Sequence, residues 1–137
     1  RGFAGAAIVD LTRPLGERRA AQLAPAPAGD YCPDAWSHDG GRLIGTVAEK
    51  VISFSFQTGT YETLASGRLP LWMADGERVL FLDPESALRM IDRRTRETRV
   101  LLQPPDGSFF GGFALSPDDR WLYLLRGTEE GDLWLSR

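Results

Sequence analysis

Short apolar runs, separated by turn-forming segments, recur along the chain. In the last quarter the runs fall at 113–115, 121–125 and 133–135, separated by a Ser-Pro-Asp-Asp segment at 116–119 and a Gly-bounded segment at 127–131. Runs of this length, dense in aromatic and aliphatic residues, are typical of β-strands. The pattern predicts three short strands in one sheet, and we expect no long helix.

The same pattern occurs twice more upstream. One unit opens at Trp36 with apolar runs at 42–47, 51–56 and 61–64, and the next opens at Trp72 with runs at 78–82, 87–91 and 98–102. Trp36 and Trp72 are 36 residues apart, and Trp72 and Leu115 are 43 residues apart. Four-stranded repeats of this size are typical of propeller blades, which are stable only when stacked. The sequence therefore predicts an all-β fold, a partial β-propeller of about three four-stranded antiparallel blades excerpted from a larger propeller.

The units divide one propeller domain into four parts. Residues 1–32 are the trailing strands of a preceding blade plus a connector, 33–67 and 68–105 are blades, and 106–137 are an incomplete C-terminal blade. Within the first part, the runs at 3–11 and 18–23 match the third and fourth strands of the later units. The segment 103–112 is expected to connect two blades. Uncovered apolar faces at both ends predict that the chain taken alone is marginal or self-associating.

Two expectations about packing follow from the repeat. Trp36, Trp72 and Leu115 should occupy equivalent, buried positions near the innermost strands of successive blades. In the run VISFSF at 51–56, Val51 falls on one face and Ile52 on the other, and one face is expected to pack against a neighbour.

Each unit has a turn after its first strand. The Asp-Gly pairs at 39–40 and 75–76 predict two-residue hairpins, since such turns require positive φ, which Gly adopts freely and Asp tolerates. The third unit has Asp-Asp at 118–119. A positive φ at Asp119 would carry a small conformational cost.

The turn phrases resemble a known repeat. WSHDGGRLI, WMADGERVLF and LSPDDRWLYLL are similar to the W-S-P-D-G-x-x-[LI]-x-[FY] phrase of TolB-like, WD40-like β-propeller repeats, and EEGDLWL resembles the phrase that closes the last such blade. In sequence style the chain is most similar to the C-terminal propeller of bacterial membrane-anchored serine/threonine protein kinases. The resemblance covers about residues 35–137. It departs at His38 and Ala74, which replace Pro, and at Asp119, which replaces Gly.

The resemblance implies a non-catalytic scaffold or sensor in the C-terminal part of a kinase or similar signalling protein. The alternatives are the accessory propeller of a serine peptidase, which gates substrate, and that of a TolB-type periplasmic translocation protein. The implied partners are the remaining blades of the same parent chain and a protein or small ligand on the loop face. In the kinase-like arrangement the propeller lies outside the cytoplasmic membrane.

Charge and residue types exclude several kinds of activity. A net charge of −3 gives no electrostatic basis for nucleic-acid binding. No apolar run approaches the ~20 residues of a spanning helix, so no membrane insertion is expected. A single cysteine, Cys32, excludes an internal disulfide and a Cys-rich metal site. The kinase phrases G-x-G-x-x-G, H-R-D and D-F-G are missing, so phosphoryl transfer is not expected within these residues.

We expect no catalytic residue, no cofactor and no metal site. His38 is the single histidine and falls in a turn, and there is no G-x-S-x-G elbow. One acidic group offers oxygens for Ca²⁺ but lacks the alternation of a calcium loop, so solvated loop charge is favoured: Asp118, Asp119, Glu129, Glu130 and Asp132. One basic group could grip a phosphate, although an exposed blade edge is favoured: Arg89, Arg93, Arg94, Arg96 and Arg99.

Ligands of a propeller are expected on the loops between blades and between second and third strands. These loops are predicted at 29–33, 67–70, 83–86, 104–112 and 126–131. The candidate binding residues are Phe109, Phe110, Arg126, Glu129 and Glu130. Two adjacent phenylalanines exceed what a polar loop needs, and exposed aromatic residues are favoured interface anchors. The alternative is that one or both pack into the channel wall.

Overall fold

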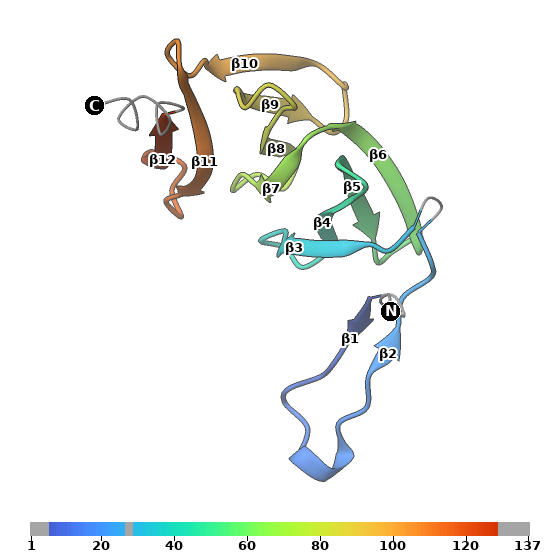
Figure 1. Cartoon of the computed structure of the whole chain (residues 1–137). Coiled ribbons are helices and arrows are strands. Elements are labelled where there is room, and N and C mark those ends of the chain that lie inside the picture. Colours follow the sequence, from blue (N-terminus) through green and yellow to red (C-terminus); the bar gives the residue numbers. More distant parts are fainter. Residues whose placement is uncertain (1–5, 27–28, 129–137) are drawn as a thin grey trace, which may run out of the picture.

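The computed structural model describes residues 6–26 and 29–128 and shows a row of antiparallel sheets (Figure 1). An N-terminal hairpin consists of β1 (Ala7–Ile8) and β2 (Ala21–Gln22), with a single 3-10 turn, η1 (Leu15–Glu17), at its tip. Blade 1 consists of β3 (Cys32–Trp36), β4 (Arg42–Val47), β5 (Lys50–Ser55) and β6 (Thr60–Ser66). Blade 2 consists of β7 (Arg68–Trp72), β8 (Arg78–Leu82), β9 (Leu88–Asp92) and β10 (Thr98–Leu102). A C-terminal hairpin consists of β11 (Ser108–Leu115) and β12 (Leu122–Thr128).

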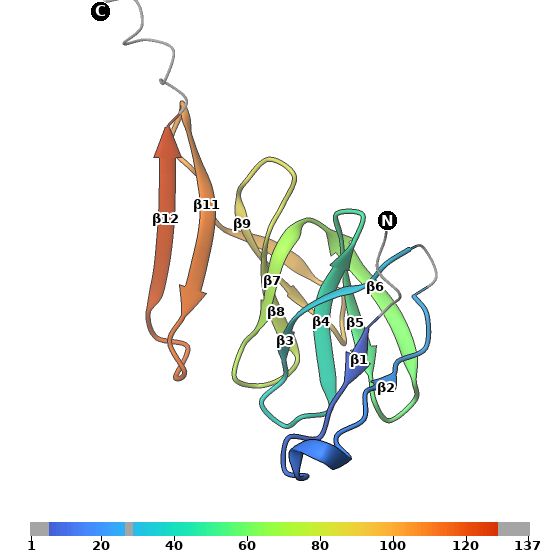
Figure 2. The ribbon, with the colours of Figure 1, turned by 60° about the horizontal axis from the view of Figure 1, so that its bottom comes forward.

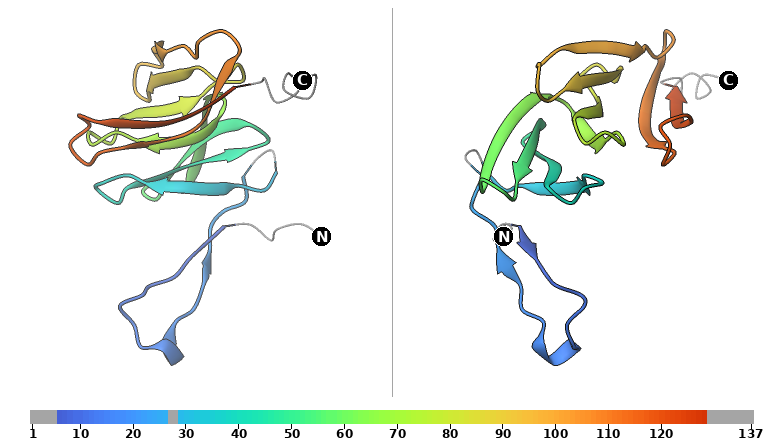
Figure 3. Two further views of the ribbon diagram at one scale, coloured as in Figure 1. Left: turned by 60° about the vertical axis from the view of Figure 1, so that its left-hand side comes forward. Right: turned by 180° about the vertical axis from the view of Figure 1, so that it is seen from behind.

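The sheets follow one another as blades of a propeller. In both complete blades the strands pair in chain order, so each blade is a four-stranded meander. The blades lie side by side in an arc, with β6 and β10 on its outer side (Figures 1 and 3). The predicted all-β partial propeller is confirmed. No helix in the described part of the chain is long and apolar enough to cross a membrane.

The inner strands begin earlier than the apolar runs indicated. β3 starts at Cys32 and β7 at Arg68, because their backbones already pair with Thr46 and Leu82. β11 starts at Ser108, so the prediction of a loop through 112 is wrong for its last five positions. The turn at Gly107, whose φ is 74°, ends the connection. The strand predicted at 133–135 lies outside the described residues.

Both faces of blade 1 are packed, although one packed face was expected. Val51 and Ile44 face blade 2, whereas Ile52 and Phe54 face the N-terminal hairpin. Alternating residues of a strand point to opposite sides of the sheet, and here both sides meet apolar neighbours. Blade 1 therefore has no core of its own. It contributes one side of the core shared with blade 2 and one side of the core shared with the N-terminal hairpin.

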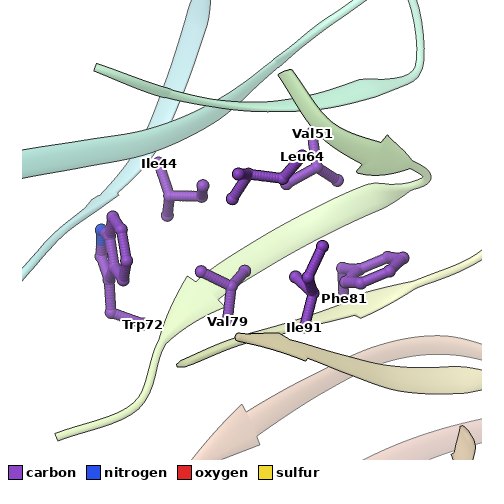
Figure 4. Close-up of a cluster of buried hydrophobic side chains, with 7 residues drawn as sticks. All are labelled: Ile44, Val51, Leu64, Trp72, Val79, Phe81 and Ile91. Carbon is purple, nitrogen blue, oxygen red and sulfur yellow. The ribbon is translucent and has the colours of Figure 1, made fainter. Parts of the chain in front are cut away.

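The core between blades 1 and 2 is shown in Figure 4. Its blade 2 side consists of Trp72, Val79, Phe81 and Ile91, and its blade 1 side consists of Ile44, Val51 and Leu64. A second core joins blade 2 to the C-terminal hairpin and is centred on Leu80, Leu82, Leu88 and Phe110. Each large side chain buried in this way contributes roughly 1.5–3 kcal/mol to stability.

Trp36, Trp72 and Leu115 occupy equivalent positions, as predicted, since each ends an inner strand. Their burial differs, however. Trp72 is 5% exposed because blade 1 covers it, whereas Trp36 is 49% exposed and stacks on Phe56 at 5.3 Å between ring centroids. The expected burial of Trp36 is therefore wrong in this chain, because the N-terminal hairpin packs against the cluster of Leu43, Val47, Ile52 and Phe54 and leaves the end of β3 half exposed.

The three turns share one geometry, but it is not the predicted two-residue hairpin. In the first, Ser37 N–H donates to Arg42 O at 2.8 Å and Gly40 N–H donates to Ser37 O at 2.9 Å, which gives a four-residue loop. Backbone hydrogen bonds at the same positions close the other two loops. The expected positive φ is confirmed, with 77° at Gly40, 71° at Gly76 and 63° at Asp119.

The Asp of each phrase holds its turn through side-chain hydrogen bonds. Its Oδ1 accepts a backbone N–H two residues later, at 2.9 Å for Asp39 and Asp75 and at 3.1 Å for Asp118. The hydroxyls of Ser37 and Ser116 also donate to Asp39 and Asp118. The pKa of Asp39 is lowered chiefly by its backbone hydrogen bond, and the pKa of Asp118 chiefly by the Ser116 hydroxyl. The Asp in the phrase is thus explained by turn structure.

We predict that Trp72→Phe is tolerated far better than Trp72→Ala. The ring of Trp72 fills the core between blades, so truncation to Ala should cost about 3–5 kcal/mol. Its Nε1 is buried and has no hydrogen-bond partner within the described residues, so Phe removes an unsatisfied donor while keeping an aromatic ring. The matched control is Trp36→Phe, which loses the 2.9 Å hydrogen bond from Nε1 to Gly40 O. Denaturant midpoints check the order, and equal losses for Trp72→Phe and Trp72→Ala would contradict it.

A second prediction concerns Asp119, whose positive φ is combined with a contact between turns. Its Oδ2 accepts Ala74 N–H at 2.9 Å. Asp119→Gly relieves the backbone strain but loses this hydrogen bond, so the two effects of about 1 kcal/mol should nearly cancel. Asp119→Ala keeps the strain and also loses the bond, and it should be about 1–2 kcal/mol less stable than wild type. Urea midpoints with unchanged slope measure both changes, and an Ala variant as stable as the Gly variant would show that positive φ is unimportant.

Candidate functional site

The loops between strands and between blades meet at one end of the molecule, which we call the loop face. Gly67, which joins blade 1 to blade 2, donates its N–H at 2.8 Å to Glu49 O in the loop between β4 and β5. Ser86, in the loop between β8 and β9, contacts Phe110 near the start of β11. The loop face is therefore continuous from blade 1 to the C-terminal hairpin.

Phe110 is a structural residue of this face. Its ring is buried in the core against blade 2. Its N–H donates to Ser86 Oγ at 3.1 Å, and its carbonyl accepts from Ser86 Oγ at 2.7 Å and from Arg68 Nη2 at 3.3 Å. The prediction of a loop position for Phe110 is wrong, because strand pairing with Arg126 and these contacts fix it against blade 2.

Phe109 points to the opposite side of β11 and is 36% exposed. Its ring lies over the backbone of Gly127, where an added Cβ would come within 2.5 Å of Phe109 Cζ. Because Gly127 has no side chain, the Phe109 ring fits against its backbone. The hydrogen bonds of Phe110 to Ser86 and Arg68 fix the adjacent backbone of β11. The exposed aromatic side chain is therefore held in a defined position by a strand.

The C-terminal hairpin reaches beyond the inner strands of blade 2. In blade 2 the inner pairing ends at Arg68↔Leu82, and its counterpart in the hairpin is Gly112↔Leu125, because Leu82 and Leu125 lie equally far from their turns. The hairpin continues past this level to Ser108↔Thr128. Figure 2 shows the long β11–β12 ladder beside the blades. We call Ser108–Phe110 with 126–128 the projecting end.

The other candidate binding residues are Arg126, Glu129 and Glu130, and the structure describes only Arg126. Arg126 is exposed in β12, opposite Phe110, so it belongs to the projecting end and not to a loop. Glu129 and Glu130 lie outside the described residues. Arg68, Ser86 and Gly127 complete the arrangement and were missed from the sequence. The sequence contained one signal for this arrangement, Gly127, which follows the apolar run 121–125. A glycine within a strand often marks the close approach of another group.

The loop at 83–87 is fixed by its own hydrogen bonds. Asp83 Oδ1 accepts the N–H groups of Glu85 and Ala87 at 2.9 and 3.0 Å, and its Oδ2 accepts Arg89 Nε at 2.7 Å. Burial alone would raise the pKa of Asp83, but the Arg89 hydrogen bond and the backbone hydrogen bonds outweigh it and lower the pKa. Pro84 and Glu85 remain exposed on this rigid loop.

Two members of the basic group, Arg93 and Arg96, join neighbouring blades. Arg93 of blade 2 pairs with Glu77 at 2.9 Å and with Glu62 of blade 1 at 3.5 Å. Arg96 pairs with the same Glu62 at 2.8 Å and also donates to Thr63 O at 2.8 Å. Since these guanidinium groups are already bound to carboxylates, the geometry favours the blade-edge interpretation over a phosphate grip.

The structure shows where the candidate metal-ligating and catalytic residues lie. No group of three or more His, Cys, Asp and Glu that could hold a metal occurs within 6–26 and 29–128. His38 lies exposed in its turn. Asp118 and Asp119 serve the third turn and the contact with Ala74. The other members of the acidic group, Glu129, Glu130 and Asp132, lie outside the described residues.

The structure is similar to β-propellers of known structure, although no protein-family model and no curated protein matches the sequence. An oligogalacturonate lyase in complex with manganese matches with a TM-score of 0.62 and 19% identity, over 71% of this chain and 28% of that one. The β-propeller domain of Cps50 (Swd1) from Myceliophteria thermophila matches with a TM-score of 0.55 and 14% identity, over 86% of this chain and 45% of that one. The chain thus spans less than half the length of these proteins, and the similarity establishes that it has a β-propeller fold.

Proposed function

We propose that this chain is a non-catalytic binding module, in which the projecting end of β11–β12 contacts a protein or small ligand on the loop face. The observation that carries the proposal is Phe109, an exposed aromatic side chain held over Gly127 beside a backbone clamped to Ser86. Aromatic side chains dominate binding energy in many interfaces. A side chain that is already ordered loses little conformational entropy on binding.

Phe109 and Arg126 lie on opposite sides of the projecting end, because Arg126 pairs with Phe110 and shares its side of the hairpin, so a ligand that wraps around this end would need both apolar and anionic parts. Arg126 is exposed on the same projecting end and presents a planar guanidinium that binds carboxylates with two hydrogen bonds. Pro84 and Glu85 are exposed on the fixed loop of blade 2 and widen the loop face. Peptide segments that carry acidic and apolar side chains fit this combination.

The inferred setting is the C-terminal part of a bacterial serine/threonine kinase or a similar signalling protein. It is supported by the resemblance of the three turn phrases and of EEGDLWL to the kinase-associated propellers. In that setting phosphoryl transfer would belong to another part of the parent protein, and the propeller would act as a sensor or scaffold outside the cytoplasmic membrane. The proposal does not depend on any similarity to the lyase.

We predict that Phe109→Ser weakens ligand binding without unfolding the chain. Peptides selected from a displayed random library on the wild-type chain should bind this variant at least about 10-fold more weakly, as expected for loss of an aromatic anchor. Leu101→Ser, which changes an exposed apolar residue of β10, is the matched control and should bind normally. Phe110→Ser should instead lower the unfolding midpoint, because that ring is in the core.

Two outcomes would contradict the proposal. Selected peptides that bind the Phe109→Ser variant as tightly as wild type would remove the projecting end from the binding site. Turnover of a simple ester by the isolated chain, abolished by His38→Ala, would show that the segment is catalytic. Isothermal titration calorimetry measures the first outcome, and absorbance of released nitrophenol measures the second.

A further inference from the structure

A polar hollow lies between blades 1 and 2, at the end of the strands opposite the loop face. It has a volume of about 330 Å³, within the ~300–1,000 Å³ of small-molecule sites. Its lining includes Arg42, Ser53, Ser55, Thr60 and Glu62 of blade 1 and Arg93 of blade 2. We call it the inter-blade hollow. Both of its walls belong to complete four-stranded blades, so further sheets at either end of the row would not fill it.

The hollow exists because the face of blade 1 that meets blade 2 changes from apolar to polar along its strands. Figure 4 shows the apolar part of this interface, which includes Val51 of β5. The alternation that places Val51 on this face also places Ser53 and Ser55 on it. Ser55 pairs with Arg42 on one side and with Thr60 on the other, so a row of polar side chains crosses the sheet here.

The repeat shows that a larger side chain fits at the position of Ser53. In blade 1, Ser53 pairs with Ile44, and in blade 2, Met90 pairs with Leu80. Ile44 and Leu80 are equivalent, since each lies two residues after the residue that closes the first turn. Met90 is therefore the counterpart of Ser53. The shorter serine side chain leaves open the space that a methionine would fill.

The hydroxyl of Ser53 is the first sign that the hollow takes a ligand. Ser53 is 2% exposed and lines the hollow. Its Oγ forms no hydrogen bond with any other residue that the structure describes, although buried polar groups almost always have a partner. Leaving such a hydroxyl unpaired is unfavourable, so the occupant of the hollow should hydrogen-bond to it.

The guanidinium of Arg42 is the second sign. Its counterpart in blade 2, Arg78, pairs with Asp75 at 2.7 Å. In blade 1 the equivalent carboxylate, Asp39, accepts instead from the Ser37 hydroxyl at 2.7 Å and from a backbone N–H. Within residues 6–26 and 29–128, Arg42 forms no ion pair. Arg42 can therefore bind an anion in the hollow.

The charges around the hollow limit the charge of that anion. Arg93 is bound to Glu77 at 2.9 Å and lies 3.5 Å from Glu62, which also binds Arg96 at 2.8 Å. These two cations and two carboxylates balance one another, which leaves the single positive charge of Arg42. A second negative charge on the ligand would be repelled by Glu62, so a monoanion is favoured over a dianionic phosphate.

We propose that the inter-blade hollow binds a small hydroxylated monocarboxylate. Arg42 and Ser55, which are paired across the sheet, hold the carboxylate. Ser53 and Glu62, the next pair, hydrogen-bond to hydroxyl groups of the ligand, since a serine hydroxyl both donates and accepts and a carboxylate accepts. The site lies at the opposite end of the blades from the projecting end and does not depend on the peptide binding proposed there.

Isothermal titration calorimetry with gluconate tests the ligand class. Gluconate carries one carboxylate and several hydroxyl groups, and it should bind the chain saturably with a dissociation constant below about 1 mM. Glucose lacks the carboxylate, acetate lacks the hydroxyl groups, and inorganic phosphate carries more charge. Each of these three should bind at least about 10-fold more weakly than gluconate.

Variants of the lining test the location. Ser53→Met places in the hollow the side chain that blade 2 has at this position, and Arg42→Gln removes the cation; each should weaken gluconate binding at least about 10-fold. Ser53→Ala should weaken binding without lowering the unfolding midpoint, because it removes a buried hydroxyl that has no protein partner. Arg78→Gln, at the counterpart of Arg42, and Phe109→Ser, at the projecting end, are controls that should bind gluconate as wild type does. Circular dichroism melts check folding.

Several results would overturn the proposal. Absence of saturable gluconate binding up to about 10 mM would mean that the hollow holds water only. Phosphate, glucose or acetate binding as tightly as gluconate would overturn the ligand class. Unchanged gluconate affinity in Arg42→Gln and Ser53→Ala would place the site elsewhere, and these two variants decide the location even if Ser53→Met does not fold.

Discussion

Apolar stacking between neighbouring sheets holds this structure together, because no blade can bury its side chains alone. Each strand of blade 1 sends alternate residues to opposite neighbours, so Ile44 and Val51 complete one core while Ile52 and Phe54 complete another. Removing one sheet would expose the facing half of the next. The contrast between buried Trp72 and exposed Trp36, which end equivalent strands, shows this dependence within one molecule.

Polar contacts at the two rims fix how the stacked sheets are positioned. On the loop face, Ser86 and Arg68 bind the backbone of Phe110 and join blade 2 to the C-terminal hairpin. At the other rim, Asp119 accepts the N–H of Ala74 in the neighbouring turn. The hydrogen bonds between Ser86 and Phe110 are buried and satisfy polar groups that would otherwise lack partners, whereas the contact of Asp119 is exposed. Both contacts set the orientation of one sheet relative to the next.

In this repeated fold, the proposed binding residues lie where the third pair of inner strands is longer than the first two. The third inner pair has the same turn as the first two, but it continues past their level to Ser108↔Thr128. The added length carries Phe109 and Arg126 onto the loop face without adding a flexible loop. A binding residue on a strand keeps its position better than one on a long loop, which agrees with the proposed role as a scaffold.

Local sequence was enough to determine the repeat, the four-stranded blades and the positive φ at Gly40, Gly76 and Asp119. Strand alternation and turn chemistry act over a few residues, and they can therefore be read from the chain directly. The turn type was wrong because an Asp-Gly pair fits both a two-residue and a four-residue loop. Backbone pairing across the turn decides between them.

Only the tertiary structure determined which of Phe109 and Phe110 is buried and which is exposed. The two residues are identical and adjacent in sequence, yet one packs against blade 2 and the other lies exposed over Gly127. Which of them enters the core depends on the register of β11 with β12 and on Ser86, a residue 24 positions away in the chain. The sequence alone determined that strands and turns alternate here, whereas the side of the sheet on which a neighbouring blade stacks determined which side chains remain free to bind.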